Sequence, residues 1–220
     1  ECLLTTARTA EMAKLTENAF RDVNIAFANE LSIICDKVDI NVWELIRLAN
    51  RHPRVNILQP GPGVGGHCIA VDPWFIVSQS PEEARLIRTA REVNDGKPEW
   101  VISKIKLAVA NFLQANPDKT AKNVTIACYG ITFKADIDDL RESPALEIAA
   151  SVTAENPGKT MVVEPNIKIL PTQLDRAELV SMEGAAQAAD VHVILVDHKE
   201  IKKHKFPELS SVLDFKGIFL

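Results

Sequence analysis

A cysteine at the exit of a glycine-rich segment has the position of a nucleophile. Cys68 follows Gly65, Gly66 and His67, and Asp72 lies four residues further along the chain. Glycines let the backbone approach a substrate closely, a thiolate can bond to an electrophilic carbon, and a carboxylate can move a proton or orient water. A free cysteine is more often a small buried apolar side chain, so spacing alone leaves both interpretations open.

Lys14 and Asn18 are candidates to assist such a reaction. They lie four residues apart, with Arg21 close to the same stripe, and therefore share one face of a predicted helix. Taken by itself, this spacing is more typical of a polar face in contact with solvent.

Charged residues also gather in a segment over residues 133–144, directly before a predicted helix. Lys134 and Arg141 flank three aspartates there. A cation at this position suits a phosphorylated ligand. A charged surface loop in which Arg141 pairs with Asp138 or Asp139 fits the spacing equally well.

Residues 61–66 formally match the GxGxxG pattern of dinucleotide-binding loops. That pattern binds a pyrophosphate only when a strand enters the loop and a helix leaves it. Here Gln59-Pro60 precedes the segment and Pro73 opposes a long helix soon after it. We therefore interpret these glycines as a tight loop that places Cys68.

The first half of the chain is predicted to be helical. Residues 9–36 contain no Gly or Pro and repeat apolar residues at helical spacing, and Asn41 with Glu44 marks the start of a short helix. Ser80-Pro81 is expected to open a third helical stretch toward residue 116, with a break at residues 96–98. Its second part carries an apolar stripe that either faces a core or pairs with a second subunit: Val101, Ile105, Ala108 and Phe112.

The second half alternates strands and helices. Strands are predicted at residues 124–130, 160–164 and 191–197, with helices at residues 143–150 and 183–189. This order predicts a small parallel sheet with ligands beyond the carboxyl ends of its strands. The expected fold class is α/β, with an all-helical domain over residues 1–117 followed by a Rossmann-like domain over residues 118–220.

Composition excludes several classes of function. The formal charge is -5 and basic residues are spread along the chain, which argues against a nucleic-acid surface. No apolar run approaches the length of a membrane span, and no signal peptide is recognisable. Four scattered cysteines without metal-ligand spacing indicate reduced thiols and a cytoplasmic protein with no metal site.

Three motifs, in this order, resemble the UDP-glucose/GDP-mannose dehydrogenase family over nearly the whole chain. They are residues 11–18 with Arg21, residues 65–73, and the segment 133–144. The family oxidises the sugar C6 alcohol to a carboxylate in two NAD-dependent steps. The resemblance implies that Cys68 forms a thiohemiacetal and then a thioester, that Lys14 and Asn18 stabilise oxyanions, and that Asp72 moves a proton or orients water.

The resemblance also implies how the substrate and the domains are arranged. Lys134, Gly65 and, less directly, Arg141 would contact the nucleotide sugar, and Arg54 would reach the substrate of a neighbouring subunit. The family has an N-terminal NAD-binding domain, a helical domain that forms a homodimer, and a C-terminal domain that binds the nucleotide sugar. This chain resembles the last two parts, so we expect NAD to bind mainly outside it and the chain alone to be inactive.

Within the family, residues 52–69 look most like the branch that oxidises UDP-N-acetyl-D-mannosamine. The UDP-glucose branch has a lysine directly before the motif aspartate, where this chain has Val71. Ala70 departs from the proline expected in much of the branch, which keeps UDP-N-acetylglucosamine and GDP-mannose as alternative substrates. A dimeric module that binds nucleotide sugars without chemistry is the alternative of a different class.

Overall fold

A computed structural model describes residues 2–204, 206 and 211–219. The chain forms two compact units. The helical unit comprises Glu1–Pro60 and Val64–Gly96, and the sheet unit comprises Gly61–Gly63 and Lys97–Leu220. The combination of a helical part with a parallel α/β part is the fold class expected from the sequence.

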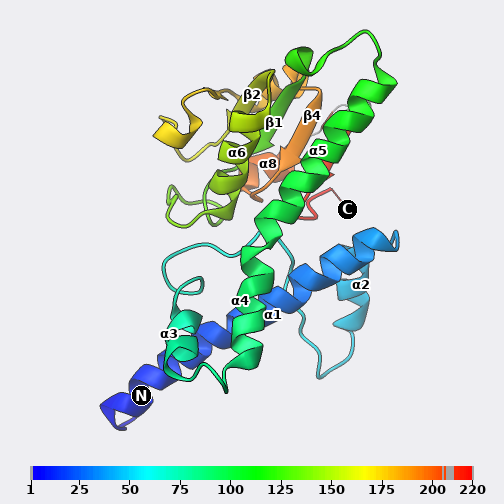
Figure 1. Cartoon of the computed structure of the whole chain (residues 1–220). Coiled ribbons are helices and arrows are strands. Elements are labelled where there is room, and N and C mark those ends of the chain that lie inside the picture. The colour runs from blue at the N-terminus through cyan, green and yellow to red at the C-terminus, as the bar shows by residue number, and fades with distance from the viewer. Residues whose placement is uncertain (1, 205, 207–210, 220) are drawn as a thin grey trace. The chain divides into compact units, whose positions relative to one another are not determined.

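The helical unit contains four helices, α1 (Ala7–Lys37), α2 (Val42–Ala49), α3 (Asp72–Gln79) and α4 (Arg85–Asp95). The Thr6 hydroxyl accepts the Thr9 amide at the start of α1. Asn41 caps α2, as predicted, because its side-chain oxygen accepts two backbone amides of the first turn. Packing against α4 and α3 holds the long helix α1 (Figure 1).

The region around α3 differs from the expectation. Pro73 does not prevent a helix, because it lies in the first turn of α3, where its missing N–H has no intrahelical role. Ser80 ends this short helix instead of starting the next one, and α4 begins only at Arg85. The predicted break at residues 96–98 is confirmed, since α4 ends at Asp95 and α5 begins at Lys97.

A buried polar cluster joins α1 to α4. The Arg91 guanidinium lies 2.5 Å from the Asp22 carboxylate, and both side chains are almost fully buried. The Asn94 amide donates to the same carboxylate oxygen at 2.8 Å. Burial raises the pKa of Asp22, although Arg91 and Asn94 oppose that shift. Breaking such a pair leaves an uncompensated buried charge, so this cluster fixes how α1 packs on α4.

The sheet unit is a doubly wound parallel sheet in the order β3-β2-β1-β4-β5. Its strands are β1 (Thr125–Tyr129), β2 (Lys159–Val163), β3 (Glu178–Leu179), β4 (Val191–Ile194) and β5 (Ser211–Asp214). Its helices are α5 (Lys97–Ala115), α6 (Pro144–Glu155), α7 (Met182–Ala188) and α8 (Lys199–Lys203), with short 3-10 turns at Ala121–Asn123 and Thr172–Leu174. The three predicted strands and two predicted helices are confirmed, whereas β3, β5 and α8 were not foreseen.

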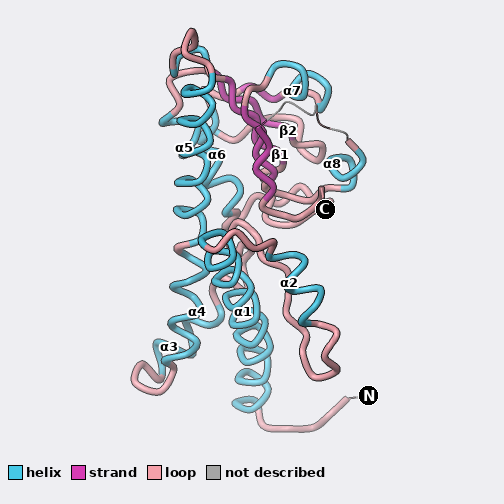
Figure 2. Tube along the Cα trace, turned by 90° about the vertical axis from the view of Figure 1, so that its right-hand side faces the viewer, coloured by secondary structure: helices cyan, strands magenta, loops and turns pink. Residues whose placement is uncertain are grey.

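Alternation along the strands divides the core between the two faces of the sheet. On β1, Ile126 and Cys128 pack in one cluster with α5 and α6, and Ala127 and Tyr129 pack in the other with α7 and α8. Figure 2 shows α5 and α6 on one side of the strands and α7 and α8 on the other. Burial raises the pKa of the Cys128 thiol to about 12, which makes Cys128 an inert core residue.

The apolar stripe of α5 faces the core rather than a second subunit. Val101, Ile105 and Ala108 are buried in the cluster that covers the sheet, and Phe112 packs against it. Because this stripe is completed by the sheet, α5 belongs to the sheet unit. The division into compact units falls at Gly96, whereas the boundary expected from the sequence lies near residue 117.

The strand order places a topological switch point between β1 and β4. In open parallel sheets, ligands bind beyond the carboxyl ends of the strands at this point. Gly130 follows β1 with φ +82°, and a Cβ there would lie 2.3 Å from the Cβ of Val196 after β4. Glycine thus lets the two chain segments approach closely at this edge of the sheet.

Among the described residues, no helix is long and apolar enough to cross a membrane.

Candidate active site

Asn18 and Asp72 form a direct contact in the helical unit. The Asn18 side-chain amide donates to the Asp72 carboxylate at 2.6 Å. Asn18 is 1% exposed and lies on α1, whereas Asp72 opens α3 and is half-buried. Two candidates that are 54 residues apart in the sequence are therefore brought together by the packing of α3 beside α1.

Cys68 lies one turn before α3 and is tied to Asp72 through the backbone. The Cys68 carbonyl accepts the Asp72 amide at 2.8 Å and the Val71 amide at 3.1 Å. The cysteine is a free thiol and is half-buried, unlike the buried Cys35 and Cys128. The loop before it turns at Gly66, where φ is +84°. The loop thus gives Cys68 a fixed backbone next to the Asn18–Asp72 pair.

Lys14 lies one helical turn before Asn18 on α1. Its ammonium lies 3.2 Å from the Glu17 carboxylate, and both side chains are more than half exposed. An exposed pair of this kind is weak and exchanges readily with water. The ammonium is thus available to a ligand at little energetic cost.

Two further candidates of the helical unit are shown as surface or loop positions. Gly65 is half-buried in the loop before Cys68. Arg54 is exposed after α2, and its backbone amide donates to the ring of His52 at 3.3 Å. Their predicted contacts with substrate remain predictions.

The sheet unit presents Lys134 and Arg141 in the segment after β1. Lys134 is exposed, and its backbone carbonyl accepts the Thr132 hydroxyl at 2.8 Å. The Arg141 guanidinium pairs with the Asp139 carboxylate at 2.6 Å. Of the two partners considered for Arg141, Asp139 is the one that the structure shows. Its role toward substrate stays a prediction.

A buried polar cluster beside this segment was missed from the sequence. Glu164 directly follows the strand β2, and His198 lies after β4. Their side chains are fully buried, and His198 Nε2 lies 3.0 Å from Glu164 Oε2. A signal was present, because Glu164 is the last residue of one predicted strand and His198 directly follows another, and the carboxyl ends of parallel strands meet at one edge of the sheet.

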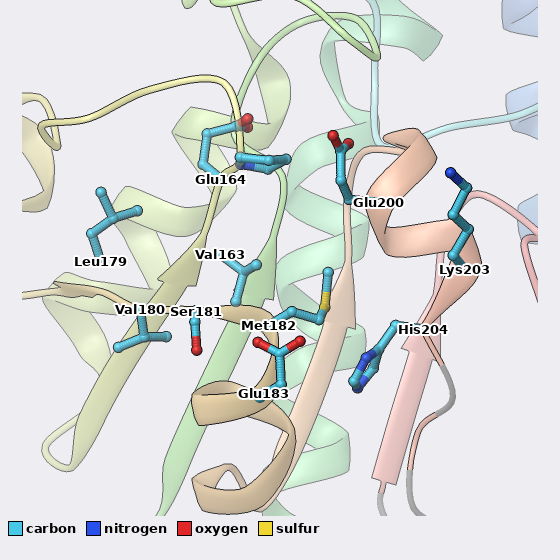
Figure 3. A pocket seen from close by; sticks show the side chains of 11 residues that line it. Val163, Glu164, Leu179, Val180, Ser181, Met182, Glu183, Glu200, Lys203 and His204 are labelled. Atoms are coloured by element: carbon cyan, nitrogen blue, oxygen red, sulfur yellow. The ribbon is translucent and has the colours of Figure 1, made fainter.

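A cavity of about 460 Å³ lies at the carboxyl ends of β2 and β3. Figure 3 shows it bordered by Glu164, by Ser181 and Glu183 near the start of α7, and by Glu200 and Lys203 of α8. None of the residues singled out above from the sequence lines it. Within the described part of the chain, no three His, Cys, Asp or Glu side chains are grouped to hold a metal ion.

A helical unit followed in the chain by a doubly wound parallel sheet defines the chain as a protein with a helical part and an α/β part. Sequence models of one family match both parts: the central domain over residues 8–96 and the UDP-binding domain over residues 127–219. The chain belongs to the UDP-glucose/GDP-mannose dehydrogenase family.

The known proteins that this chain resembles are about twice as long as the chain. It is 64% identical to the UDP-N-acetyl-D-mannosamine dehydrogenase of Salmonella typhi, with 100% of the chain and 53% of that protein covered. It is 60% identical to an NDP-N-acetyl-D-galactosaminuronic acid dehydrogenase of Ralstonia solanacearum, with 99% and 50% covered. The solved UDP-D-ManNAc dehydrogenase from Pyrococcus horikoshii superposes with a TM-score of 0.85 at 35% identity, with 99% and 50% covered. The chain thus spans about half the length of these relatives.

Proposed function

We propose that this chain is the central and sugar-binding part of an NAD-dependent dehydrogenase that oxidises C6 of UDP-N-acetyl-D-mannosamine. The placement of Asn18, Asp72 and Cys68 on adjoining elements of the helical unit carries the proposal. The 64% identity to an enzyme named for that substrate supports the choice of sugar.

In this proposal Cys68 captures the C6 aldehyde that the first oxidation produces. The thiolate adds to the aldehyde carbon, and the resulting thiohemiacetal keeps a reactive intermediate bound. The thiohemiacetal would become a thioester by loss of a second hydride to NAD, and water would then attack the thioester, releasing the carboxylate and restoring the thiol. Asp72 would orient that water or accept its proton.

Lys14 and Asn18 would stabilise the negative charge that develops on the C6 oxygen. One amide hydrogen of Asn18 is bonded to Asp72, and an amide nitrogen carries a second one. A preorganised donor of this kind is typically worth about 3 kcal/mol in the transition state. Lys14 adds a mobile positive charge one turn away.

The nucleotide end of the substrate is assigned to the sheet unit. Lys134 lies in the segment after β1, at the switch point where parallel sheets bind ligands. Its ammonium would contact the substrate there, with Arg141 as a second cation. Gly65 and, from a second subunit, Arg54 complete the proposed substrate contacts.

The described residues do not fit a dinucleotide. Residues 61–66 are neither preceded by a strand nor followed at once by a helix. Glu164 holds the position after the second strand at which dinucleotide folds bind a ribose, but both of its oxygens accept hydrogen bonds from within the unit. We therefore propose that NAD binds mainly to residues outside this chain, and that the chain alone does not turn over substrate.

We also propose a homodimer formed through the helical unit. Phe20, Phe27 and Ile34 recur every seven residues on α1 and are 69%, 52% and 48% exposed. An apolar stripe of this length on one helix fits a second copy of the same surface. The cytoplasmic location expected from the sequence remains a prediction.

A chimera tests the function. In it, this chain replaces the equivalent part of the Salmonella typhi relative, whose N-terminal part is retained. We expect it to reduce NAD with UDP-N-acetyl-D-mannosamine and to form two NADH per product. Faster turnover of UDP-N-acetylglucosamine or GDP-mannose would show that one of these is the substrate instead of UDP-N-acetyl-D-mannosamine. Nucleotide-sugar binding by a folded chimera without turnover would favour the non-catalytic module.

A further inference from the structure

The Glu164–His198 pair lies at the switch point but has no part in the proposed reaction. Glu164 comes from the carboxyl end of β2, where Figure 3 shows it, and His198 from the segment after β4. Both side chains are fully buried and lie 3.0 Å apart. Buried polar groups at a ligand-binding edge need a reason, because each costs free energy unless it is fully bonded.

Glu164 is held as a carboxylate. Its Oε2 accepts the Ile131 amide at 2.9 Å, and its Oε1 accepts the Asn166 amide at 3.0 Å. Burial alone would raise the pKa of Glu164, but the hydrogen bonds from His198 and from these two amides outweigh it and lower the pKa. The acceptor facing His198 Nε2 is therefore negatively charged.

The other side of the histidine ring determines its tautomer. The backbone amide of Asp136 points at His198 Nδ1 at 3.0 Å. A backbone N–H only donates, so Nδ1 must carry a lone pair. The ring hydrogen then lies on Nε2 and is donated to Glu164, which stabilises the same tautomer. His198 thus connects the carboxylate to the backbone at residue 136.

Besides the bond to Asp136, further hydrogen bonds hold the backbone around Lys134, among them the Phe133 amide to the Asp139 carbonyl at 3.2 Å. Thr132 Oγ1 donates to the Lys134 carbonyl at 2.8 Å, and the Asp136 carboxylate accepts the Lys199 amide at 3.0 Å. Asp136 also has φ +61°, in the left-handed region that aspartate adopts more readily than most non-glycine residues. The exposed Lys134 side chain therefore projects from a backbone fixed on both sides.

We propose that His198 is a positioning residue that orders the Lys134 segment for the diphosphate of a nucleotide sugar. This inference rests on the proposed function of Lys134. A segment ordered before binding loses less conformational entropy when the ligand arrives, so affinity rises without a new contact. His198 does this from the segment after β4, where its side chain is fully buried.

Two substitutions separate the contact of His198 Nδ1 with Asp136 from the contact of Nε2 with Glu164. His198→Asn can place its side-chain oxygen near the former Nδ1 and keep the acceptor for Asp136. His198→Gln can place its amide near the former Nε2 and keep the donor for Glu164. In the chimera we expect His198→Gln to raise KM for UDP-N-acetyl-D-mannosamine about tenfold with kcat within about twofold, and His198→Asn to keep KM within about twofold.

Lys134→Ala is the reference variant. If it raises KM and His198→Gln does not, the positioning role is wrong and the proposed function stands. If Lys134→Ala leaves KM unchanged, the assigned role of Lys134 fails, and this inference fails with it. Equal increases of KM in both His198 variants would also contradict the inference. Such a result would mean that an acceptor for the Asp136 amide, which His198→Asn retains, does not improve substrate binding.

A ligand-free measurement covers the case in which the variants do not fold. Nitrogen-15 NMR of the unsubstituted 220-residue chain distinguishes the tautomers of its five histidines. We expect the His198 signals to show hydrogen on Nε2 and none on Nδ1. A hydrogen on Nδ1 would remove the acceptor for Asp136 and overturn the proposal, whatever the substrate.

Discussion

The Asn18 side chain on α1 donates a 2.6 Å hydrogen bond to the Asp72 carboxylate at the start of α3. Asn18 is almost completely buried, whereas Asp72 is half-buried. The bond therefore joins a rigid helix to the short helix that follows Cys68. It links the geometry of the thiol loop to the stability of the helical unit.

This contact predicts energetic coupling between the two side chains. We expect Asn18→Ala to lower the free energy of unfolding by about 1–2 kcal/mol, because it removes the donor from a short bond to a charged acceptor. In a double-mutant cycle with Asp72→Ala, the coupling should exceed about 0.5 kcal/mol. Urea unfolding of the four chains measures it. Additive effects would show that the bond does not form in solution.

Much of this site was foreseeable, because the helical spacing of Lys14 and Asn18 and the glycines before Cys68 are local patterns. The Asn18–Asp72 contact was not, since it depends on α3, a short helix that was not predicted and that carries Pro73 in its first turn. The sheet and its order of elements followed from three apolar strands. The assignment of α5 to the sheet unit did not follow from the sequence, because the apolar stripe of α5 has the same spacing whether it packs on a sheet or on a second subunit.

The His198 cluster shows a second limit of sequence reasoning. Glu164 and His198 are 34 residues apart in the sequence. They meet only because β2 and β4 run parallel on either side of β1, so that their carboxyl ends lie at the same edge of the sheet. Their positions at or directly after the ends of predicted strands are visible in the sequence. Their burial and their shared contact with the Lys134 segment are not.

Thiol reactivity should separate the four cysteines. Cys2 is exposed, Cys68 half-buried, and Cys35 and Cys128 buried. In a Cys2→Ser chain we expect iodoacetamide to modify Cys68 first. Cys128 should be nearly inert, because a pKa of about 12 leaves roughly one thiolate in ten thousand at pH 8. Peptide mass spectrometry over time checks the order, and equal rates at Cys68 and Cys128 would contradict it.

Acid should weaken the sheet unit through Glu164. Its pKa is lowered from an ordinary value of 4.5, so its carboxylate stabilises the fold above that pH, and this contribution is lost as pH falls through the lower, folded-state pKa. We expect Glu164→Gln to be less stable than the parent at pH 7, with a difference that shrinks steadily below pH 4.5. Denaturant unfolding at several pH values measures this difference. A stability difference between the two chains that stays constant at acid pH would show that the charge of Glu164 does not contribute to stability.

The exposed stripe of α1 should decide the oligomeric state. We expect light scattering to give twice the 24.2 kDa chain mass, and Phe27→Glu to reduce it to the monomer by placing a charge in the apolar contact. Leu107→Glu is the matched control, since Leu107 is similarly exposed but lies on α5. A parent chain that is monomeric at tens of micromolar, or a Phe27→Glu chain that stays dimeric, would count against the proposed interface.

The chemistry depends on a covalent bond to Cys68, and the Cys68→Ala chimera tests it most directly. We predict that this variant still binds UDP-N-acetyl-D-mannosamine with near-parent affinity in calorimetry, because the thiol contributes chemistry rather than recognition. Its steady-state formation of the uronate should fall by about a thousandfold or more, because the aldehyde is no longer captured. A Cys68→Ala chimera that forms uronate and two NADH per sugar at the parent rate would contradict the account.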